Sequence, residues 1–241
     1  MIQAEKARGD VSNGYWHRLL IAVFLIVLIT PAWGADKSKG EETLKNAAKV
    51  LREMLSSNSV PADVLASANC VIVLPSVKKF DCGIGGSGGR GPMTCRGGAN
   101  FNGKWSAPAM YTIGGASMGF QVGGSSTDFV LLIMSQKGVD AVLKGKTKLG
   151  SDATAAAGPS GVTRAGTMKG TDMLTYARAS GLFAGTSLGG ATLEPDKDAN
   201  QRLYAKAMTA KEILPQNAVK TTPGGGDLVS LLNAKLAKHK S

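Results

Sequence analysis

The hydrophobic periodicity of the chain changes near Cys70, and this change restricts the fold more than any other feature. Four apolar residues recur at helical spacing over residues 41–55: Leu44, Ala48, Leu51 and Leu55. Beyond Cys70 the apolar residues form short runs bounded by Gly, Pro and Ser, as strands do. This order predicts an α+β domain with a twisted, mainly antiparallel sheet, an N-terminal amphipathic helix and C-terminal helices.

The remaining elements follow from the same patterns. Strands are expected over residues 70–74, 80–86, 91–98, 105–113, 117–122, 129–134, 153–157, 174–178 and 182–188. Further helices are expected over residues 61–68, 136–143, 196–208 and 227–238. Pro75 is expected to end the first strand, and the Pro-Gly-Gly-Gly segment at 223–226 is expected to be a linker.

The glycine-rich residues 87–90 predict a tight link between two strands of a hairpin. If the hairpin turns on Gly88 and Gly89, Cys82 and Cys95 lie directly opposite each other, within disulfide reach. We therefore expect a Cys82–Cys95 disulfide, with two unpaired thiols as the alternative. Cys70 is expected to be a core residue, and without a C-x-x-C pair neither a zinc nor a thioredoxin-type site is predicted.

The N-terminus has the features of an export signal. Eleven consecutive apolar residues, 19–29, follow Arg18, and the small residues Ala32 and Gly34 suit cleavage after Gly34. Because a membrane-spanning helix needs about 20 apolar residues, a cleaved signal is favoured over a retained anchor. The expected organisation is a signal peptide at 1–34, one folded domain at 35–214 and a basic helix and tail at 215–241. The expected location is periplasmic or secreted, with membrane association.

Residues 35–241 carry 25 basic and 15 acidic residues, a surplus that favours anionic partners. Nucleic acid is not expected, because few aromatic residues are available for stacking. His17 and His239 are the only histidines, which excludes Ser-His-Asp, Cys-His and His-ligated metal chemistry from the domain between them. A hydrolase using Ser, Asp or Lys is not favoured, since no G-x-S-x-G elbow or paired acidic cluster is present.

Two motifs resemble nucleotide-binding loops. Residues 83–88 match G-x-G-x-x-G, but the Gly-Arg-Gly-Pro that follows cannot begin the required helix. Gly-Lys-Thr at 145–147 lacks the earlier glycine of a P-loop, because Asp140 occupies that position. No cofactor, metal or catalytic residue is therefore predicted.

Seven segments together resemble the SYLF domain family, in order along the chain. They are AAKVLRE at 47–53, PADVLASA at 61–68, VLPSVKK at 73–79, GKWSAP at 103–108, GGASMGFQVG at 114–123, DFVLLIM at 128–134 and GLFAGTSLGG at 181–190. The resemblance covers residues 45–214. The KKFDC sequence at 78–82 and the two cysteines of the predicted hairpin depart from the family pattern.

The resemblance implies a non-enzymatic α+β domain that binds lipids, with phosphoinositide and actin association in eukaryotic members. It also implies that a basic amphipathic N-terminal helix makes the membrane contact, and Lys45, Lys49 and Arg52 fall on that helix here. Three basic residues supply only ~3 kcal/mol at an anionic surface, so Lys78, Lys79 or exposed apolar residues are expected to contribute. The expected partner is anionic phospholipid on the non-cytoplasmic side; the alternative is a structural or adhesion-type envelope protein that binds a protein or polymer.

Overall fold

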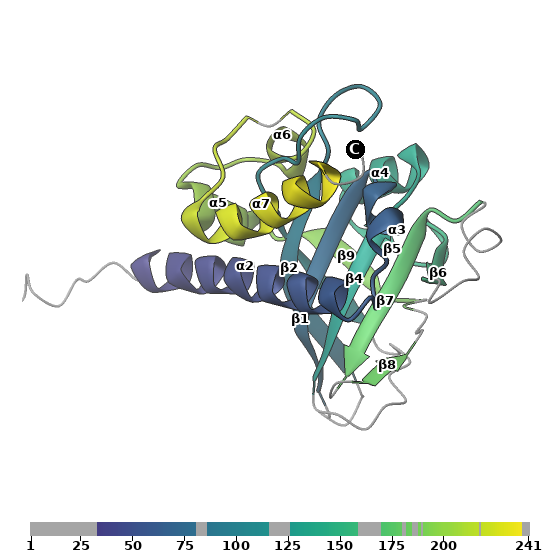
Figure 1. Ribbon diagram of the computed structural model, residues 1–241. Helices are drawn as coiled ribbons and strands as arrows, with labels where there is room; N and C mark the ends of the chain where they lie inside the picture. Colours follow the sequence, from purple (N-terminus) through teal and green to yellow (C-terminus); the bar gives the residue numbers. More distant parts are fainter. Residues whose placement is uncertain are drawn as a thin grey trace, which may run out of the picture. The chain divides into compact units, whose positions relative to one another are not determined.

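The computed structural model describes residues 33–80, 86–115, 126–158, 170–179, 182–184, 188, 190–216 and 218–237 (Figure 1). The chain separates into two units, Met1–Ala35 and Asp36–Ser241. The second unit carries the sheet and the helices described below. Most of the predicted signal segment and the predicted strand at 117–122 lie outside the described residues.

A nine-stranded sheet forms the centre of the second unit within these residues, in the order β5-β9-β3-β2-β1-β4-β7-β6, with β8 paired to β7. The strands are β1 (Cys70–Phe80), β2 (Gly86–Cys95), β3 (Ala109–Gly115), β4 (Ser126–Ile133), β5 (Thr147–Lys148), β6 (Ala155–Ala157), β7 (Met173–Ala179), β8 (Leu182–Ala184) and β9 (Thr192–Pro195). Every pair is antiparallel except β6 with β7. The predicted α+β class and mainly antiparallel sheet are confirmed.

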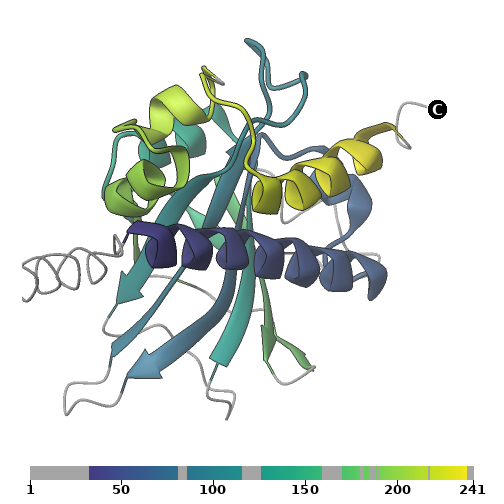
Figure 2. The ribbon, with the colours of Figure 1, turned by 90° about the vertical axis from the view of Figure 1, so that its left-hand side faces the viewer.

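Helices cover the sheet. They are α2 (Trp33–Ser56), α3 (Ala62–Ala66), α4 (Gln136–Leu143), α5 (Lys197–Tyr204), α6 (Ala210–Ile213) and α7 (Pro223–Ala237). Helix α2 lies across one face of the sheet, and α7 lies on the same side of the sheet (Figures 1 and 2). On the other side, α4 and α6 contribute to a second apolar cluster.

The apolar face of α2 packs against the interior of the protein. The predicted residues Leu44, Ala48 and Leu51 are all buried, while Leu55 is half-buried. Ala48, Leu51 and Leu55 pack, with α3 and α7, against residues of β1 and β4 such as Val71 and Val130. Leu44 packs separately, against Met110 of β3 and two residues of α5. Burial of each large aliphatic side chain stabilises the fold by about 1.5–3 kcal/mol. The helix begins earlier than predicted, because the polar residues before position 41 have no apolar repeat.

Strand β1 does not end at Pro75, so that prediction was wrong. Pairing with β4 shifts register between Leu74 and Val77, and Ser76 has a left-handed φ of 52°. The Ser76 N–H donates to the Asp128 carboxylate of β4 at 2.9 Å instead of to a backbone carbonyl of that strand. A bulge therefore absorbs the proline, which lacks an N–H, without stopping the strand.

The predicted position of the hairpin turn, at residues 87–90, was also wrong, although β1 and β2 do pair as consecutive antiparallel strands. Residues 87–90 lie within β2, and β1 pairs with β2 in the register Phe80↔Gly86 and Cys70↔Cys95, so the link spans residues 81–85. The glycines of β2 serve close packing, not a turn. A Cβ at Gly91 would lie 1.9 Å from the Val73 carbonyl oxygen, and one at Gly89 would lie 2.8 Å from the Val77 side chain.

The Pro-Gly-Gly-Gly segment begins helix α7 and is not a linker. Proline suits the first turn of a helix, where its missing N–H is not needed. A Cβ at Gly224 would meet the Glu41 side chain at 2.4 Å, and one at Gly225 would meet Pro108 at 2.8 Å. The glycines therefore allow the start of α7 to approach α2 and the segment before β3.

Other predicted boundaries differ to a smaller extent. The prediction for α4 is confirmed residue for residue, whereas β3 starts four residues later than expected. Helix α5 ends at Tyr204, because Ala205 takes the left-handed conformation with φ 54°. Strands β5 and β9 and helix α6 were not predicted, since each has only two to four residues.

Candidate functional site

The outer face of α2 carries a row of basic side chains. Lys45, Lys49 and Arg52 are all exposed, and the Lys49 side chain is 73% exposed. Their spacing of four and three residues places them along one side of the helix, opposite the buried apolar residues. The Lys49 Nζ lies 4.0 Å from Oε1 of Glu53, and an exposed ion pair of this kind adds little to stability. The row can therefore attract anions, but it offers no apolar side chain for insertion into a bilayer.

An ion network fixes the C-terminal half of α2 to the sheet. Arg178 of β7 donates to Glu53 of α2 at 2.6 Å and to Asp128 of β4 at 2.8 Å. Burial opposes the charge of Arg178, but the hydrogen bonds that it donates to both carboxylates, together with their negative charges, outweigh burial and raise the pKa of this guanidinium. Because Asp128 also accepts from Ser76, one network joins α2, β7, β4 and the β1 bulge.

A second contact fixes the N-terminal half of α2. The Glu41 carboxylate accepts a hydrogen bond from the Gly224 N–H at 2.5 Å and one from the Thr222 hydroxyl at 3.3 Å. The carboxylate thus lies at the N-terminus of α7, where the helix dipole favours negative charge. Together with the Arg178 network, this contact holds α2 with its basic row outward.

The two basic residues predicted on β1 lie on a different element from the α2 row. Lys78 is exposed and pairs through its backbone with Gly88 and Ser126. Lys79 belongs to the same strand, but its side chain lies outside the described residues. Their contribution to lipid contact, like that of the α2 row, remains a prediction.

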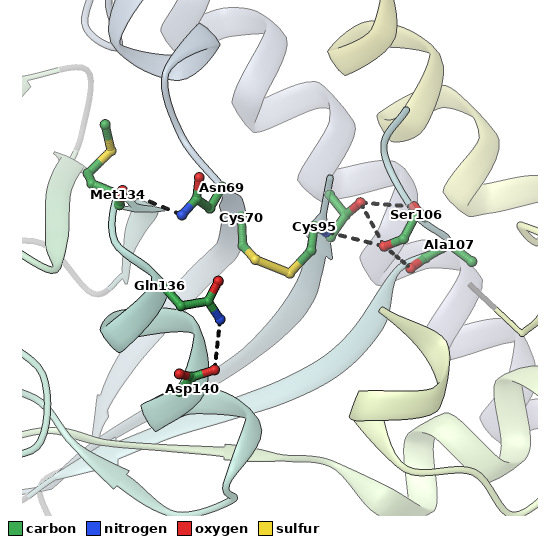
Figure 3. The surroundings of a disulfide bond; sticks show 9 residues. Asn69, Cys70, Cys95, Ser106, Ala107, Met134, Gln136 and Asp140 are labelled. Atoms are coloured by element: carbon green, nitrogen blue, oxygen red, sulfur yellow. Dashed lines mark hydrogen bonds between the residues drawn. A yellow bond between two sulfur atoms is a disulfide. The ribbon is translucent and has the colours of Figure 1, made fainter. Parts of the chain in front are cut away.

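The disulfide of the structure joins Cys70 to Cys95, the first residue of β1 to the last residue of β2 (Figure 3). Both residues are fully buried, and their Cα atoms are 4.0 Å apart. The predicted Cys82–Cys95 bond was wrong because the β1–β2 link lies at 81–85, which changes the residue opposite Cys95. Cys70 is therefore more than a core residue, and Cys82 lies outside the described residues.

Hydrogen bonds fix the backbone around this disulfide (Figure 3). The Cys95 N–H donates to the Ser106 hydroxyl at 3.2 Å, and the Thr94 hydroxyl donates to the Ser106 carbonyl at 2.9 Å. The two cysteines are 25 residues apart in the chain. A disulfide that closes a loop of about that length stabilises a fold by roughly 3–4 kcal/mol. The sequence carries no signal for this bond, because the residue opposite Cys95 depends on the register of β1 and β2.

Within the ranges that the structure describes, no helix combines the length and apolar character that crossing a bilayer requires. In the same ranges, no group of three or more His, Cys, Asp and Glu side chains is placed to hold a metal ion.

Comparison with known proteins places residues 114–235 in a described family. Their sequence matches the family profile "Ysc84: Las17-binding protein actin regulator". This match includes β4 to β9 and most of α7, and therefore half of the chain.

Curated relatives extend the similarity over most of the chain. The rat SH3 domain-containing YSC84-like protein 1 is 34% identical over 212 residues, covering 82% of this chain and 60% of the relative. The human protein of the same name is 35% identical over 181 residues, covering 70% and 52%. Protein YSC84 of Saccharomyces cerevisiae is 31% identical over 204 residues, covering 79% and 42%. The chain thus spans about half the length of these relatives.

Proposed function

The chain belongs to the Ysc84, or SYLF, family, and from that premise we propose that it is a non-enzymatic module that binds anionic phospholipid through helix α2. The row of Lys45, Lys49 and Arg52 is the observation that carries the proposal. A helix whose apolar side is buried and whose outer side is basic suits a flat anionic surface better than an apolar partner.

The energy of this contact sets its expected behaviour. Each basic residue near an anionic membrane contributes about 1 kcal/mol, so the row supplies about 3 kcal/mol. Because Glu41 and the Arg178 network hold α2 on the sheet, the contact is electrostatic and not an insertion. Salt should therefore weaken it strongly, since exposed charges are screened within about 10 Å at 0.1 M ionic strength.

Two features of the chain support a proposed location outside the cytoplasm. The apolar run at 19–29 has the form of an export signal, and the Cys70–Cys95 disulfide needs an oxidising compartment to persist. Both support a periplasmic or extracellular module. On that side the available anionic lipids are envelope lipids such as phosphatidylglycerol and cardiolipin.

Co-sedimentation with vesicles tests the proposal. The purified protein should pellet with phosphatidylglycerol vesicles at low salt and stay in the supernatant with phosphatidylcholine vesicles. The variant K45E/K49E/R52E should lose at least about tenfold in affinity, as the three contacts are worth about 3 kcal/mol. The variant K104E/K206E/K220E, which changes three exposed loop lysines, has the same net charge and should pellet like wild type. Equal losses in both variants would mean that net charge, and not α2, governs binding.

A protein partner is the second candidate, and the relatives' names favour it. The family description and the S. cerevisiae relative "LAS seventeen-binding protein 3", 28% identical over 81% of this chain, both refer to binding of Las17. By analogy, this chain would be a structural or adhesion-type envelope protein whose sheet or helices contact another protein. This second candidate function predicts that the protein captures a specific partner in lipid-free buffer. The yield should be the same for wild type and K45E/K49E/R52E.

A further inference from the structure

A groove of about 800 Å³ lies at the junction of α4, β9, α5 and α6, and it shares no residue with the basic row of α2. Its walls are the turn after α4, the end of β9, the first turns of α5 and the segment leading into α6. This volume falls within the range of sites that hold small organic ligands.

Hydrogen bonds fix the walls of this groove in place. The Thr147 hydroxyl donates to the Ala141 carbonyl at 2.8 Å, which pins the turn after α4. The Asn200 amide pairs with both backbone groups of Met110 and ties α5 to β3. Thr209 and Glu212 form a capping box at the start of α6. The groove is therefore preformed, as small-molecule sites usually are.

The rim of the groove is cationic. Lys144, Lys146, Lys197 and Lys211 all line it and are exposed. None of these four lysines forms an ion pair with a carboxylate in the part of the chain that the structure describes.

Three carboxylates also line the groove, and one of them is already engaged. Glu212 accepts hydrogen bonds from the Thr209 N–H and hydroxyl at 2.7 and 2.8 Å, and these bonds lower its pKa. The Glu212 carboxylate is thus already hydrogen-bonded at the start of its own helix. Glu194 and Asp198 remain, so the lysines outnumber the carboxylates that are free to compete for them.

The floor of the groove is apolar. Met208 and Ala210 are buried, while Leu143 and Pro195 are half-buried. Met208 and Ala210 belong to the apolar cluster beneath β3, against which Leu143 also packs. An apolar floor below a ring of unpaired lysines is complementary to a ligand with an anionic head and a short apolar body.

We propose that this groove binds single molecules of an amphiphilic anion, with a phosphate or carboxylate group held by the lysines and an apolar body on the Leu143–Met208 floor. The inference is independent of membrane contact through α2, because the ligand is a monomer in solution. The apolar floor predicts preference over a bare anion, and the lysines predict preference over a ligand with no net charge.

Titration of the full-length protein with soluble probes tests the proposal. The probes are dihexanoyl phosphatidylglycerol below its micelle concentration, dihexanoyl phosphatidylcholine and inorganic phosphate, with binding measured by calorimetry. Amide chemical shifts in labelled protein locate the site without any substitution. We expect saturable binding of phosphatidylglycerol, at least about tenfold weaker binding of the other two probes, and shifts confined to residues 143–146, 194–201 and 207–212.

Paired variants separate this groove from the rest of the charged surface. K146E/K197E should weaken phosphatidylglycerol binding at least about tenfold, whereas K104E/K220E, with the same net charge, should bind like wild type. K45E/K49E/R52E should also bind the monomer like wild type, even where it no longer pellets with vesicles. The proposal is overturned by absence of binding, by equal affinity for all three probes, or by shifts that lie on α2 and not in the groove.

Discussion

The basic row of α2 and the groove beside α5 are both lysine-rich surfaces, but the chain builds them in different ways. The row comes from one helix, where Lys45, Lys49 and Arg52 follow from helical spacing alone. The groove comes from four elements between residues 143 and 212, whose side chains meet only because the sheet brings them together. A surface made by one element can be found in the sequence, whereas a surface made by several needs the fold.

The two surfaces also differ in what supports them. The α2 row depends on a docked helix with a wholly apolar inner face and an ion network at one end. The groove depends on short caps and on single hydrogen bonds between loops. Substitutions beneath the α2 row should therefore cost more stability than substitutions in the groove wall, and the following predictions test this difference from the largest effect to the smallest.

The substitution Leu51→Ala should have the largest effect on stability. Leu51 is fully buried between α2 and the sheet, and loss of such a side chain costs about 3 kcal/mol through lost burial and the cavity that remains. Lys49→Ala, two residues earlier on the exposed face, should change the free energy of unfolding by less than about 0.5 kcal/mol. Urea denaturation followed by circular dichroism measures both. Equal stability of the two variants would mean that α2 is not docked on the sheet.

The substitution Arg178→Met should come next. It leaves the Glu53 and Asp128 carboxylates without their shared cation, and we expect a loss of about 2 kcal/mol. Fully buried pairs lose more, but the Arg178 side chain is 19% exposed and the stranded charges can reach water. Arg202→Met is the control, because its contact with Asp36 at 3.9 Å joins two half-exposed groups. If Arg202→Met destabilises the protein as much as Arg178→Met does, the Arg178 network contributes no more to stability than an ordinary surface ion pair.

The substitution Asp172→Asn should cost about 1.5 kcal/mol at pH 7. Asp172 accepts hydrogen bonds from Ser135 at 2.6 Å and from the Thr154 N–H and hydroxyl, and so holds the start of α4 against β6 and β7. Burial raises the pKa of this carboxyl, but these bonds and the charge of Lys137 outweigh burial and lower it.

This lowered pKa gives the effect a definite pH dependence. An unfolded aspartate has a pKa near ~3.9, so the contribution of Asp172 is complete above about pH 5 and is lost as the pH falls through the lower folded value. The stability difference between wild type and Asp172→Asn should therefore shrink below pH 4. If the stability difference between wild type and Asp172→Asn stays constant from pH 7 to pH 3, the ionised carboxylate of Asp172 is not what stabilises the wild type.

The substitution Thr209→Ala should have the smallest effect of the series, about 1 kcal/mol, because it removes the cap of a four-residue helix. Thr209→Ser keeps the hydroxyl and should retain most of the stability. The same two variants also test the groove, because only the alanine variant removes the hydroxyl that donates to Glu212, while the N–H of residue 209 still donates in both. Phosphatidylglycerol monomer should then bind more weakly to Thr209→Ala than to Thr209→Ser, and identical affinities would show that the capping box does not shape the groove.

Sequence patterns predicted the elements of this fold better than their pairing. Helix α4 and the core of α2 were correct because their apolar residues repeat at helical spacing. The β1–β2 register was missed because the glycines of β2 were interpreted as a turn, although Gly91 exists to let β1 approach. The start of α7 was missed for the same reason, since Gly224 and Gly225 accommodate Glu41 and Pro108.

The sites show the same limit. Exposure of Lys45, Lys49 and Arg52 was predictable, because an amphipathic helix leaves its polar face outward. The Cys70–Cys95 pair was not, since it depends on a register that only the fold defines. The sequence did not predict the groove, because Lys146 and Lys197 are 51 residues apart in the chain and the Gly-Lys-Thr around Lys146 is only an incomplete P-loop.

The claim that α2 is the anionic-lipid contact is tested most directly by vesicle binding across ionic strength. Wild type and K45E/K49E/R52E are titrated with phosphatidylglycerol vesicles from 0.05 to 0.5 M salt, concentrations at which screening length falls from about 14 to 4 Å. We predict that wild type binds tightly at low salt and loses affinity steeply, while the variant binds at least about tenfold more weakly at low salt and shows a flatter dependence. A variant that matches wild type at every salt concentration would contradict the account.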